Sequence, residues 1–573
     1  MASYLHESSK LLYEYSENFN ISLDLIQRLA QFLKLDTFID SEVQDPQTKQ
    51  SVKRLSIAGS LLLVDIDFID SHTVTKVALA SGNHSTSAVS SAHSEENAVI
   101  STTKVDDTTV VRVNFLEANF VSFLNIRNDN DASVAENILK ENLRGPKLGK
   151  FPSNLKYLAN LDRLSPPEGD LVLYLDNIAK YLEVVHMQEC KLRPEDEDIR
   201  SGQSSIIGKL MYNETQSLEL GVFLQFWKTK NKTKSSQYNE VIEHQTYVGR
   251  LSVIESEGPN RDYLKEATKS LWEPRDQENA SLEYKITFDD EKHLPKGVSV
   301  CGPNNKQWEL QFNLNHPVYL PREIIDYLGF DKYEVANDTD LKEVFDKIIE
   351  FGSVDLMSES KNLRVQLDLK GFSDYIPLTS VSLPSLNSIA KLLPSLRNHI
   401  LLSTWITEVA ELPDCCITDP TETEAKKQKD AHSELAEEEV LRLNAMTESN
   451  AYVGVQVLDS NANTDVEDFF KQEDEDENMD KDNIESEAAT PQPQGPFVKL
   501  QLNDIDFSSR LLDLQFSISG RMESGTPIEG SFKLQNGAFI KAEDDKMEVS
   551  KTKSFIDALE LSEDLLQVLD NAN

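Results

Sequence analysis

The chain has 573 residues, and its 98 acidic residues against 57 basic ones give a formal net charge of −41. This charge repels phosphate backbones, so it excludes general electrostatic binding of the whole chain to DNA or RNA and favours basic partners. Hydrophobic residues make up 39% of the chain, below the roughly 45–50% of a typical globular domain, so part of it is expected to be unfolded. The 4 cysteines form no C-x-x-C pair, and there is no signal-like start or membrane-length apolar run, so we expect a reducing compartment and no membrane.

The first segment, residues 1–58, is predicted to be helical. Within 22–34, apolar residues recur at helical spacing behind Ser22, which is expected to cap the helix. Residues 60–70 and 74–80 follow as two strands, the first of them alternating between acidic and apolar residues in its second half. A small sheet is therefore expected to follow the N-terminal helices.

The rest of the N-terminal region combines an insertion with two helices. The stretch 82–107 is rich in Ser, Thr, Asn and Glu and lacks periodicity, which predicts a flexible insertion, and residues 110–115 are expected to return to the sheet. Apolar residues at helical spacing over 155–164 and 175–185 predict two helices separated by a Pro-Pro break. Residues 1–190 are thus expected to form a helix-rich N-terminal region with a small sheet.

From about residue 200 to 410 the apolar pattern changes to period two, which indicates strands with one exposed face and therefore a mainly antiparallel β body. The clearest alternating segments are 218–226, 284–288, 308–314 and 363–369. Interspersed helices are predicted at 322–329, 340–351 and 384–410. The predicted fold class is therefore α+β.

The C-terminal third contains a linker and a final ordered segment. Residues 411–495 include a dense acidic run and few branched apolar residues, which predicts a disordered acidic linker. Order is expected to resume at 496–573 with a three-stranded meander and a C-terminal helix. Because a small isolated sheet is marginally stable, we expect this segment to dock on the central body.

Motifs that carry chemistry are absent from the sequence. It has no phosphate-binding glycine loop, no H-E-x-x-H and no G-x-S-x-G, and we expect no catalytic residue, cofactor or metal. Asp65 and Asp67 share one face of a predicted strand, where a polar face is favoured over a paired-carboxylate site. An enzyme with dispersed catalytic residues stays open as an alternative.

Apolar residues near the start of the chain are candidates for partner binding. Leu11, Leu12 and Tyr15 lie in a predicted terminal helix that either packs on its own core or binds a neighbouring protein. Assembly into a large complex needs a preformed surface with apolar anchors. We therefore expect the main partner surface in the ordered N-terminal region.

The acidic linker carries two further candidates. Phe469 and Phe470 are surrounded by carboxylates, a pattern of disordered segments that expose aromatic residues to a partner groove, although a simple solubilising linker has the same composition. Thr490 precedes a proline and is a minimal site for proline-directed phosphorylation. The two phenylalanines are therefore candidates for partner binding, and Thr490 is a candidate for phosphorylation.

Two sequence blocks resemble fungal Mediator subunit 1. The first is RLSIAGSLLLVDIDF with VTKVALASGN (54–68 and 74–83), and the second is NLKYLANLDRLSPPEGDLVLYLDNIAKYLE (154–183). The resemblance implies a non-catalytic subunit in the nucleus that contacts other Mediator middle-module subunits. Through them it would act indirectly on RNA polymerase II and gene-specific regulators, with no direct contact to nucleic acid. A scaffold or adaptor of another nuclear complex is the alternative.

One departure from the family pattern concerns nuclear receptors. Animal members carry L-x-x-L-L helices that dock into these receptors, and this chain has no such motif. The nearest match is Ile389-x-x-Leu392-Leu393, whose spacing is typical of a buried helix face. Receptor binding by this route is therefore not implied.

Overall fold

The computed structural model places most of the predicted ordered regions. Phe469, Phe470, Thr490 and nearly all of the acidic linker lie outside the residues that it describes. The described residues are 11–44, 51–81, 100–105, 108–113, 124, 132–165, 170–191, 205–229, 232–236, 239–243, 245–258, 261–267, 284–288, 307–337, 341–358, 362–369, 372, 374–412, 415–419, 497–507, 512–521, 525, 527–541, 558–559, 565 and 568.

The N-terminal sheet has four antiparallel strands in chain order: β1 (Asp36–Gln44), β2 (Ser51–Ala58), β3 (Leu62–Phe68) and β4 (Val74–Ser81). The strands predicted at 60–70 and 74–80 are confirmed. The prediction of helix over residues 1–58 is wrong for β1 and β2. Val52 and Leu55 have a helical spacing, but Leu55 and Ile57 are buried in alternation with more exposed residues, which is the pattern of a strand.

Helices pack on this sheet, and the last of them packs on strands of the next sheet. They are the short η1 (Ser16–Asn18), α2 (Leu23–Phe32), α3 (Val134–Asn142), α4 (Phe151–Leu164) and α5 (Leu171–Lys191). Ser22 caps α2 as predicted, because its Oγ accepts a hydrogen bond of 3.1 Å from the backbone N–H of Leu25. The two helices predicted from leucine spacing are confirmed as α4 and α5.

The central sheet has six antiparallel strands in the order β14-β17-β13-β11-β8-β7. Their bounds are β7 (Lys209–Glu214), β8 (Glu219–Lys228), β11 (Thr246–Glu255), β13 (Trp308–Pro321), β14 (Tyr333–Val335) and β17 (Tyr375–Ser382). The accompanying helices are α6 (Tyr263–Ala267), α7 (Arg322–Leu328), α8 (Lys342–Phe351) and α9 (Asn387–Ala410). The last three confirm the helices predicted in this body.

The C-terminal sheet has seven strands in the order β18-β15-β16-β19-β20-β21-β22. Their bounds are β15 (Ser353–Ser358), β16 (Leu363–Asp368), β18 (Cys415–Thr418), β19 (Phe497–Asp506), β20 (Asp513–Arg521), β21 (Pro527–Gln535) and β22 (Ala538–Lys541). The predicted meander is β19 to β21, and it joins the body edge to edge because β19 pairs in parallel with β16. The prediction of a disordered linker over 411–495 is wrong for β18, which pairs with β15.

Two smaller sheets complete the described strands. One has the order β12-β6-β5, from β5 (Ile100–Val105), β6 (Thr108–Val113) and β12 (Tyr284–Phe288), and the other pairs β9 (Lys232–Ser236) with β10 (Asn239–Glu243). The prediction of a flexible insertion over 82–107 is therefore wrong for β5. The strand predicted at 110–115 does not return to the N-terminal sheet, because β6 pairs with β5 and with the distant β12.

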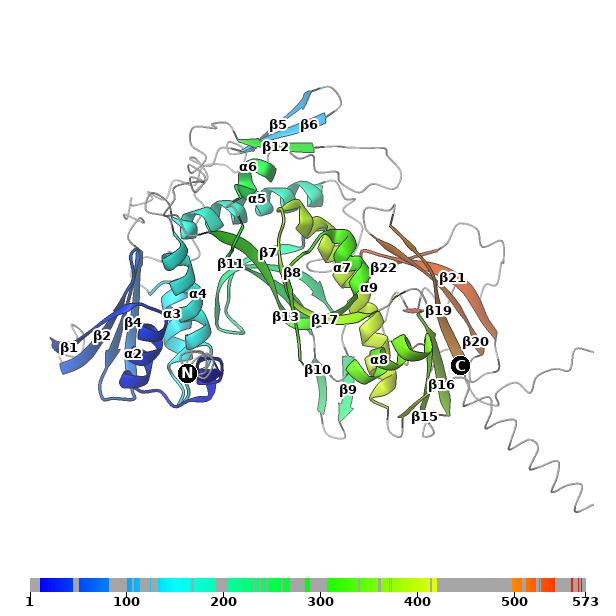
Figure 1. Ribbon diagram of the computed structural model, residues 1–573, viewed down its shortest axis with the longest axis horizontal. Helices are drawn as coiled ribbons and strands as arrows, with labels where there is room; N and C mark the ends of the chain where they lie inside the picture. The colour runs from blue at the N-terminus through cyan, green and yellow to red at the C-terminus, as the bar shows by residue number, and fades with distance from the viewer. Residues whose placement is uncertain are drawn as a thin grey trace, which may run out of the picture.

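The three large sheets lie side by side and are joined by two helices (Figure 1). Helix α4 contacts β3 of the N-terminal sheet and both β8 and β11 of the central sheet. Helix α9 contacts β8 and β13 of the central sheet and β15, β18 and β21 of the C-terminal sheet. The result is an α+β fold whose hydrophobic core continues from one sheet to the next through these helices.

Candidate interaction surface

Three large apolar side chains are exposed on the turn that precedes the N-terminal sheet. Residues 11–14 form a single helical turn that runs into η1. Leu11, Leu12 and Tyr15 expose 54%, 60% and 63% of their surface, whereas Tyr13 between them is buried. These three residues, here called the N-terminal apolar patch, are therefore not part of the core, and a partner that covered them would remove apolar surface from water.

Tyr13 attaches this turn to the rest of the protein through contacts with α4 and α2. Its hydroxyl donates a hydrogen bond of 2.6 Å to the backbone carbonyl of Pro152 at the start of α4, and its ring stacks on Phe32 with ring centres 5.4 Å apart. Burial, with a smaller contribution from the negative charge of Glu17, raises the pKa of the Tyr13 hydroxyl well above its ordinary value. The hydroxyl is therefore a permanent donor that holds the turn in place.

The segment after the patch is held along its length. Residues 16–21 are joined to the loop 146–149 by three backbone hydrogen bonds of 2.9–3.1 Å. The ammonium group of Lys150 lies 3.5 Å from the carboxylate of Glu17 and 3.7 Å from that of Glu219. The patch is thus mounted on a fixed support, so that little conformational entropy would be lost when a partner binds.

The two sequence blocks that resemble Mediator subunit 1 meet in space at one carboxylate. Asp162 of α4 accepts hydrogen bonds of 2.6–3.1 Å from the backbone N–H groups of Ser60, Leu61 and Leu62, in the turn between β2 and β3. A side chain on Gly59 would overlap with this carboxylate, since an added Cβ would lie 2.4 Å from its oxygen. The two blocks are therefore joined by a packing contact between the sheet and α4.

Helix α9 buries a run of three polar residues between the central and C-terminal sheets. Arg397 donates to the backbone carbonyls of Phe226 (2.7 Å) and Ser205 (3.2 Å) and to the side chain of Asn536. Asn398 accepts a hydrogen bond of 2.8 Å from the backbone N–H of Gly537. The Asn536–Gly537 turn, in which both residues have positive φ, is therefore locked onto α9.

Sequence reasoning did not identify this buried arginine. An arginine in an amphipathic helix is normally assigned to the exposed face, so the residue type alone did not indicate that Arg397 is buried. The usable signal was the three consecutive polar residues at 397–399 in the middle of a helix that is apolar on both sides.

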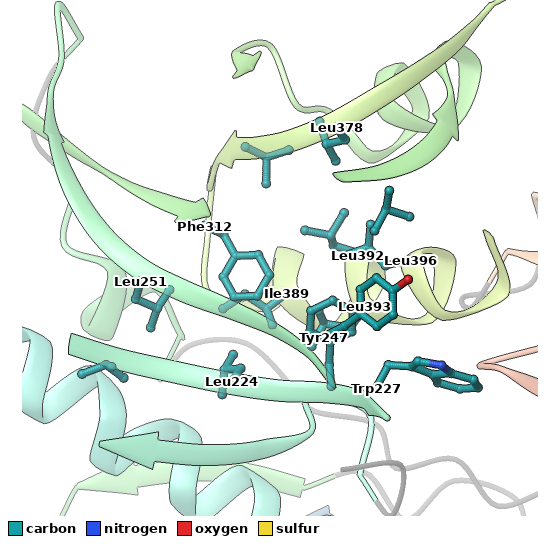
Figure 2. Packing of buried hydrophobic residues seen from close by; sticks show 14 of the residues in the cluster. Leu224, Trp227, Tyr247, Leu251, Phe312, Leu378, Ile389, Leu392, Leu393 and Leu396 are labelled. Carbon is teal, nitrogen blue, oxygen red and sulfur yellow. The ribbon is translucent and has the colours of Figure 1, made fainter. Parts of the chain in front are cut away.

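The segment nearest to a receptor-docking motif is part of the core, as predicted. The side chains of Ile389, Leu392 and Leu393 are fully buried, with 0% exposure each. Figure 2 shows them on α9, packed among side chains such as Phe312 of the central sheet. A helix buried in this way cannot enter a groove on another protein without unfolding.

The paired carboxylates of β3 form a polar face. Arg54 of β2 donates two hydrogen bonds, of 2.7 and 2.9 Å, to the carboxylate of Asp67, and Ser56 donates one of 2.6 Å to Asp65. Val64 and Ile66 on the other side of the strand are buried, as expected from the alternation. The carboxylates are thus engaged in cross-strand pairing.

A cavity of about 180 Å³ lies where β11, β13 and β17 reach one end of the central sheet. One of its two acidic groups, Glu309, accepts hydrogen bonds from Lys332 (3.0 Å), Ser256 (2.9 Å) and Ser382 (3.1 Å). These four side chains are therefore bonded to one another. Over the part of the chain that the structure describes, no three His, Cys, Asp or Glu residues are grouped as metal ligands, and no helix is long and apolar enough to cross a membrane.

The described residues thus form an α+β body with a candidate contact surface, an exposed apolar patch on a fixed support. The family described as Mediator of RNA polymerase II transcription subunit 1 matches residues 6–411, more than half of the chain, and the chain therefore belongs to this family. The match ends with α9, before β18 and the C-terminal strands. No curated protein sequence matches the chain.

Proposed function

We propose that this member of the Mediator subunit 1 family, of the fungal type, is a non-catalytic subunit of the Mediator coactivator and works in the nucleus through protein contacts. The observation that carries this proposal is the family match over residues 6–411, which includes both the N-terminal and the central sheets. The cavity at the end of the central sheet adds support for a structural role, because its Glu309 is bonded to Ser256 and Lys332.

The N-terminal apolar patch is the surface that we assign to assembly. Its three side chains are exposed, whereas the buried Tyr13 and the backbone bonds of 16–21 fix their positions. Other Mediator subunits of the middle module would cover the patch, and through them the chain would connect gene-specific regulators with RNA polymerase II. A preformed apolar anchor of this kind suits stable assembly better than a disordered segment, which loses affinity to ordering.

The test replaces Leu11, Leu12 and Tyr15 together with Ser in the full chain. Because these side chains are exposed, the melting temperature should stay unchanged, whereas co-purification of Mediator subunits should fall at least tenfold if the patch carries about 1.4 kcal/mol or more of binding energy. Co-purified subunits are quantified by mass spectrometry.

Two further variants separate this surface from its rivals. The control replaces Ile69 and Phe351, which are exposed apolar residues elsewhere, with Ser, and should leave assembly intact. Replacing Phe469 and Phe470 with Ser should also leave it intact. The assignment is wrong if the patch variant assembles normally, if its melting temperature drops strongly, or if loss of the two phenylalanines alone releases the chain. Recovery of an unrelated nuclear complex would contradict membership of Mediator itself.

A further inference from the structure

A serine followed by proline lies at the corner between α4 and α5. The sequence places a serine or threonine before proline at Ser165, Thr490 and Thr526, and of these the described residues include Ser165 alone. Such a pair is the minimal site of a proline-directed kinase. Ser165 is half-buried and follows the last residue of α4 with an extended backbone, φ −60° and ψ 127°, because the next residue is proline. It therefore lies just outside the helix.

The hydroxyl of Ser165 joins the two helices. It donates a hydrogen bond of 2.7 Å to the backbone carbonyl of Leu161 in the last turn of α4. It also accepts one of 3.1 Å from the backbone N–H of Leu171, the first residue of α5. A phosphate ester at this oxygen has no hydroxyl hydrogen, so the bond to the carbonyl of Leu161 cannot form.

The surroundings of this hydroxyl are small and acidic. Ser165, Asp162 and Asp170 line a cavity of about 10 Å³, which is the space of a single water molecule. Both carboxylates are buried. A phosphoryl group adds a phosphorus and three oxygens and a charge of about −2 at neutral pH. The cavity cannot hold this group, and the two carboxylates repel it.

The neighbouring groups that could stabilise a phosphate are already bonded. Arg163, two residues away, forms an ion pair of 2.6 Å with Glu255. At the start of α5, Asp170 accepts hydrogen bonds from the backbone N–H groups of Val172 (2.8 Å) and Leu173 (3.4 Å). A helix start would otherwise attract an anion, but here a carboxylate occupies it. A phosphate on Ser165 is therefore expected to separate the two helices rather than to hold them together.

We propose that Ser165 is phosphorylated by a proline-directed kinase and that the phosphate releases the end of α4 from α5. The serine oxygen attacks the γ-phosphorus of ATP, so that a new O–P bond forms, the bond to ADP breaks and the hydroxyl proton passes to a base of the kinase. Because α4 contacts β3 as well as β8 and β11, its release loosens the N-terminal sheet from the central sheet. The proposal goes beyond assembly into Mediator, and its test needs no other subunit, so the two can fail separately.

The first test measures the modification. The full chain with Thr490→Ala and Thr526→Ala is incubated with a cyclin-dependent kinase and ATP, and mass spectrometry should locate one phosphate, at Ser165. The same chain with Ser165→Ala should take up none. A peptide of residues 160–171 shows whether the sequence by itself is a substrate. A peptide that is not phosphorylated, or a phosphorylated peptide beside an unmodified folded chain, would each overturn the proposal.

The second test measures the release by native-state hydrogen exchange. Asp162, in the last turn of α4, holds the backbone N–H groups of residues 60–62. Exchange of these amides should become about tenfold faster after phosphorylation, whereas β20 in the C-terminal sheet should be unchanged. Kinase treatment of the Ser165→Ala chain should change neither. Unaltered exchange of residues 60–62 in the fully phosphorylated chain, or an equal rise in β20, would contradict a release at this corner.

Discussion

The polar residues buried in α9 show how single side chains hold this fold together. Arg397 and Asn398 together bond to the central sheet and to the hairpin turn at Asn536 and Gly537. Removing one partner from such a buried arrangement leaves the others without hydrogen bonds, which typically costs about 1–3 kcal/mol for each group. The contact between the two sheets therefore depends on a few polar groups within a large apolar interface.

His399, the next residue, makes the stability of α9 sensitive to acid. Its Nδ1 lies 2.8 Å from the backbone carbonyl of Ser395, and burial lowers the pKa of its imidazole from 6.5 to about 4, against a smaller opposing effect of this bond. The unfolded chain binds a proton below about pH 6.5, whereas the folded chain does so only near pH 4. The folded state is therefore destabilised as pH falls between these values.

We predict that His399→Gln removes this dependence. Between pH 7 and pH 5 the lowered pKa of His399 should cost the folded chain about 2 kcal/mol, and the variant should lack this loss. Melting temperatures of both proteins across this pH range measure the difference. An equally steep fall in the two proteins would show that other groups cause the acid sensitivity.

Burial of individual residues was predictable only where the pattern was strong. The apolar spacing of Ile389, Leu392 and Leu393 correctly placed them in the core, and the alternation in β3 correctly separated its two faces. The bonds of Arg397 were not predictable, because its partners come from β8 and from the turn after β21, which are distant in sequence. The burial of Tyr13 was also not predictable, because the neighbouring Leu11 and Leu12 are exposed and no local pattern separates them.

At the level of elements, we predict that the contact between α4 and the β2–β3 turn depends on Asp162. Three backbone N–H groups donate to its carboxylate, and that of Leu62 is buried, so Asp162→Ala leaves these donors without their acceptor. The free energy of opening at this turn should fall by about 2–3 kcal/mol. Native-state hydrogen exchange of residues 60–62 measures it.

The matched control for this variant is Asp70→Ala. Asp70 accepts similar bonds from His72 and Thr73, but it is exposed and lies within a single hairpin. Asp70→Ala should change hydrogen exchange only in the turn that contains Asp70 and not at residues 60–62. If both variants exchange residues 60–62 at the same rate as the unaltered chain, Asp162 does not fasten the sheet to α4.

Whether an element could be predicted from the sequence depends on how far apart in the sequence its interacting residues lie. Helices α4, α5 and α9 have repeats long enough to identify them locally, and the meander has clear alternation. Strands β1 and β2 were wrongly predicted as helix because short apolar spacings fit both a helix and a strand until the partner strand is known. The parallel pairs of β6 with β12 and of β16 with β19 join distant segments, which no local pattern specifies.

On the scale of the whole molecule, the boundary of the family match does not coincide with a boundary of the fold. Residues 6–411 include β15 and β16, but the sheet continues through β19 to β22, which lie beyond the match. Without these strands, β16 would become an open edge, and Arg397 and Asn398 would lose their partners at the Asn536–Gly537 turn. We therefore expect a chain that ends at residue 495 to aggregate or be degraded.

The chain between β18 and β19 should, in contrast, be dispensable for folding. Thr418 at the end of β18 and Lys499 near the start of β19 lie in one row across the sheet, through Asp355 and Gln366. Three steps between neighbouring strands span only about 14 Å, at about 4.8 Å each. Both strands run in the same direction, and a connection of about a dozen residues suffices for such a crossover.

Replacing residues 420–496 with a Gly-Ser linker of about 15 residues should therefore leave the fold intact. The shorter loop should raise stability by about 1–2 kcal/mol, because less entropy is lost when its ends are brought together. Circular dichroism, the melting temperature and hydrogen exchange of β16 and β19 compare this variant with the full chain and with the chain ending at 495. Loss of protection at β19 in the linker variant, or a cooperative and soluble chain ending at 495, would show that the C-terminal strands are not an integral part of the sheet.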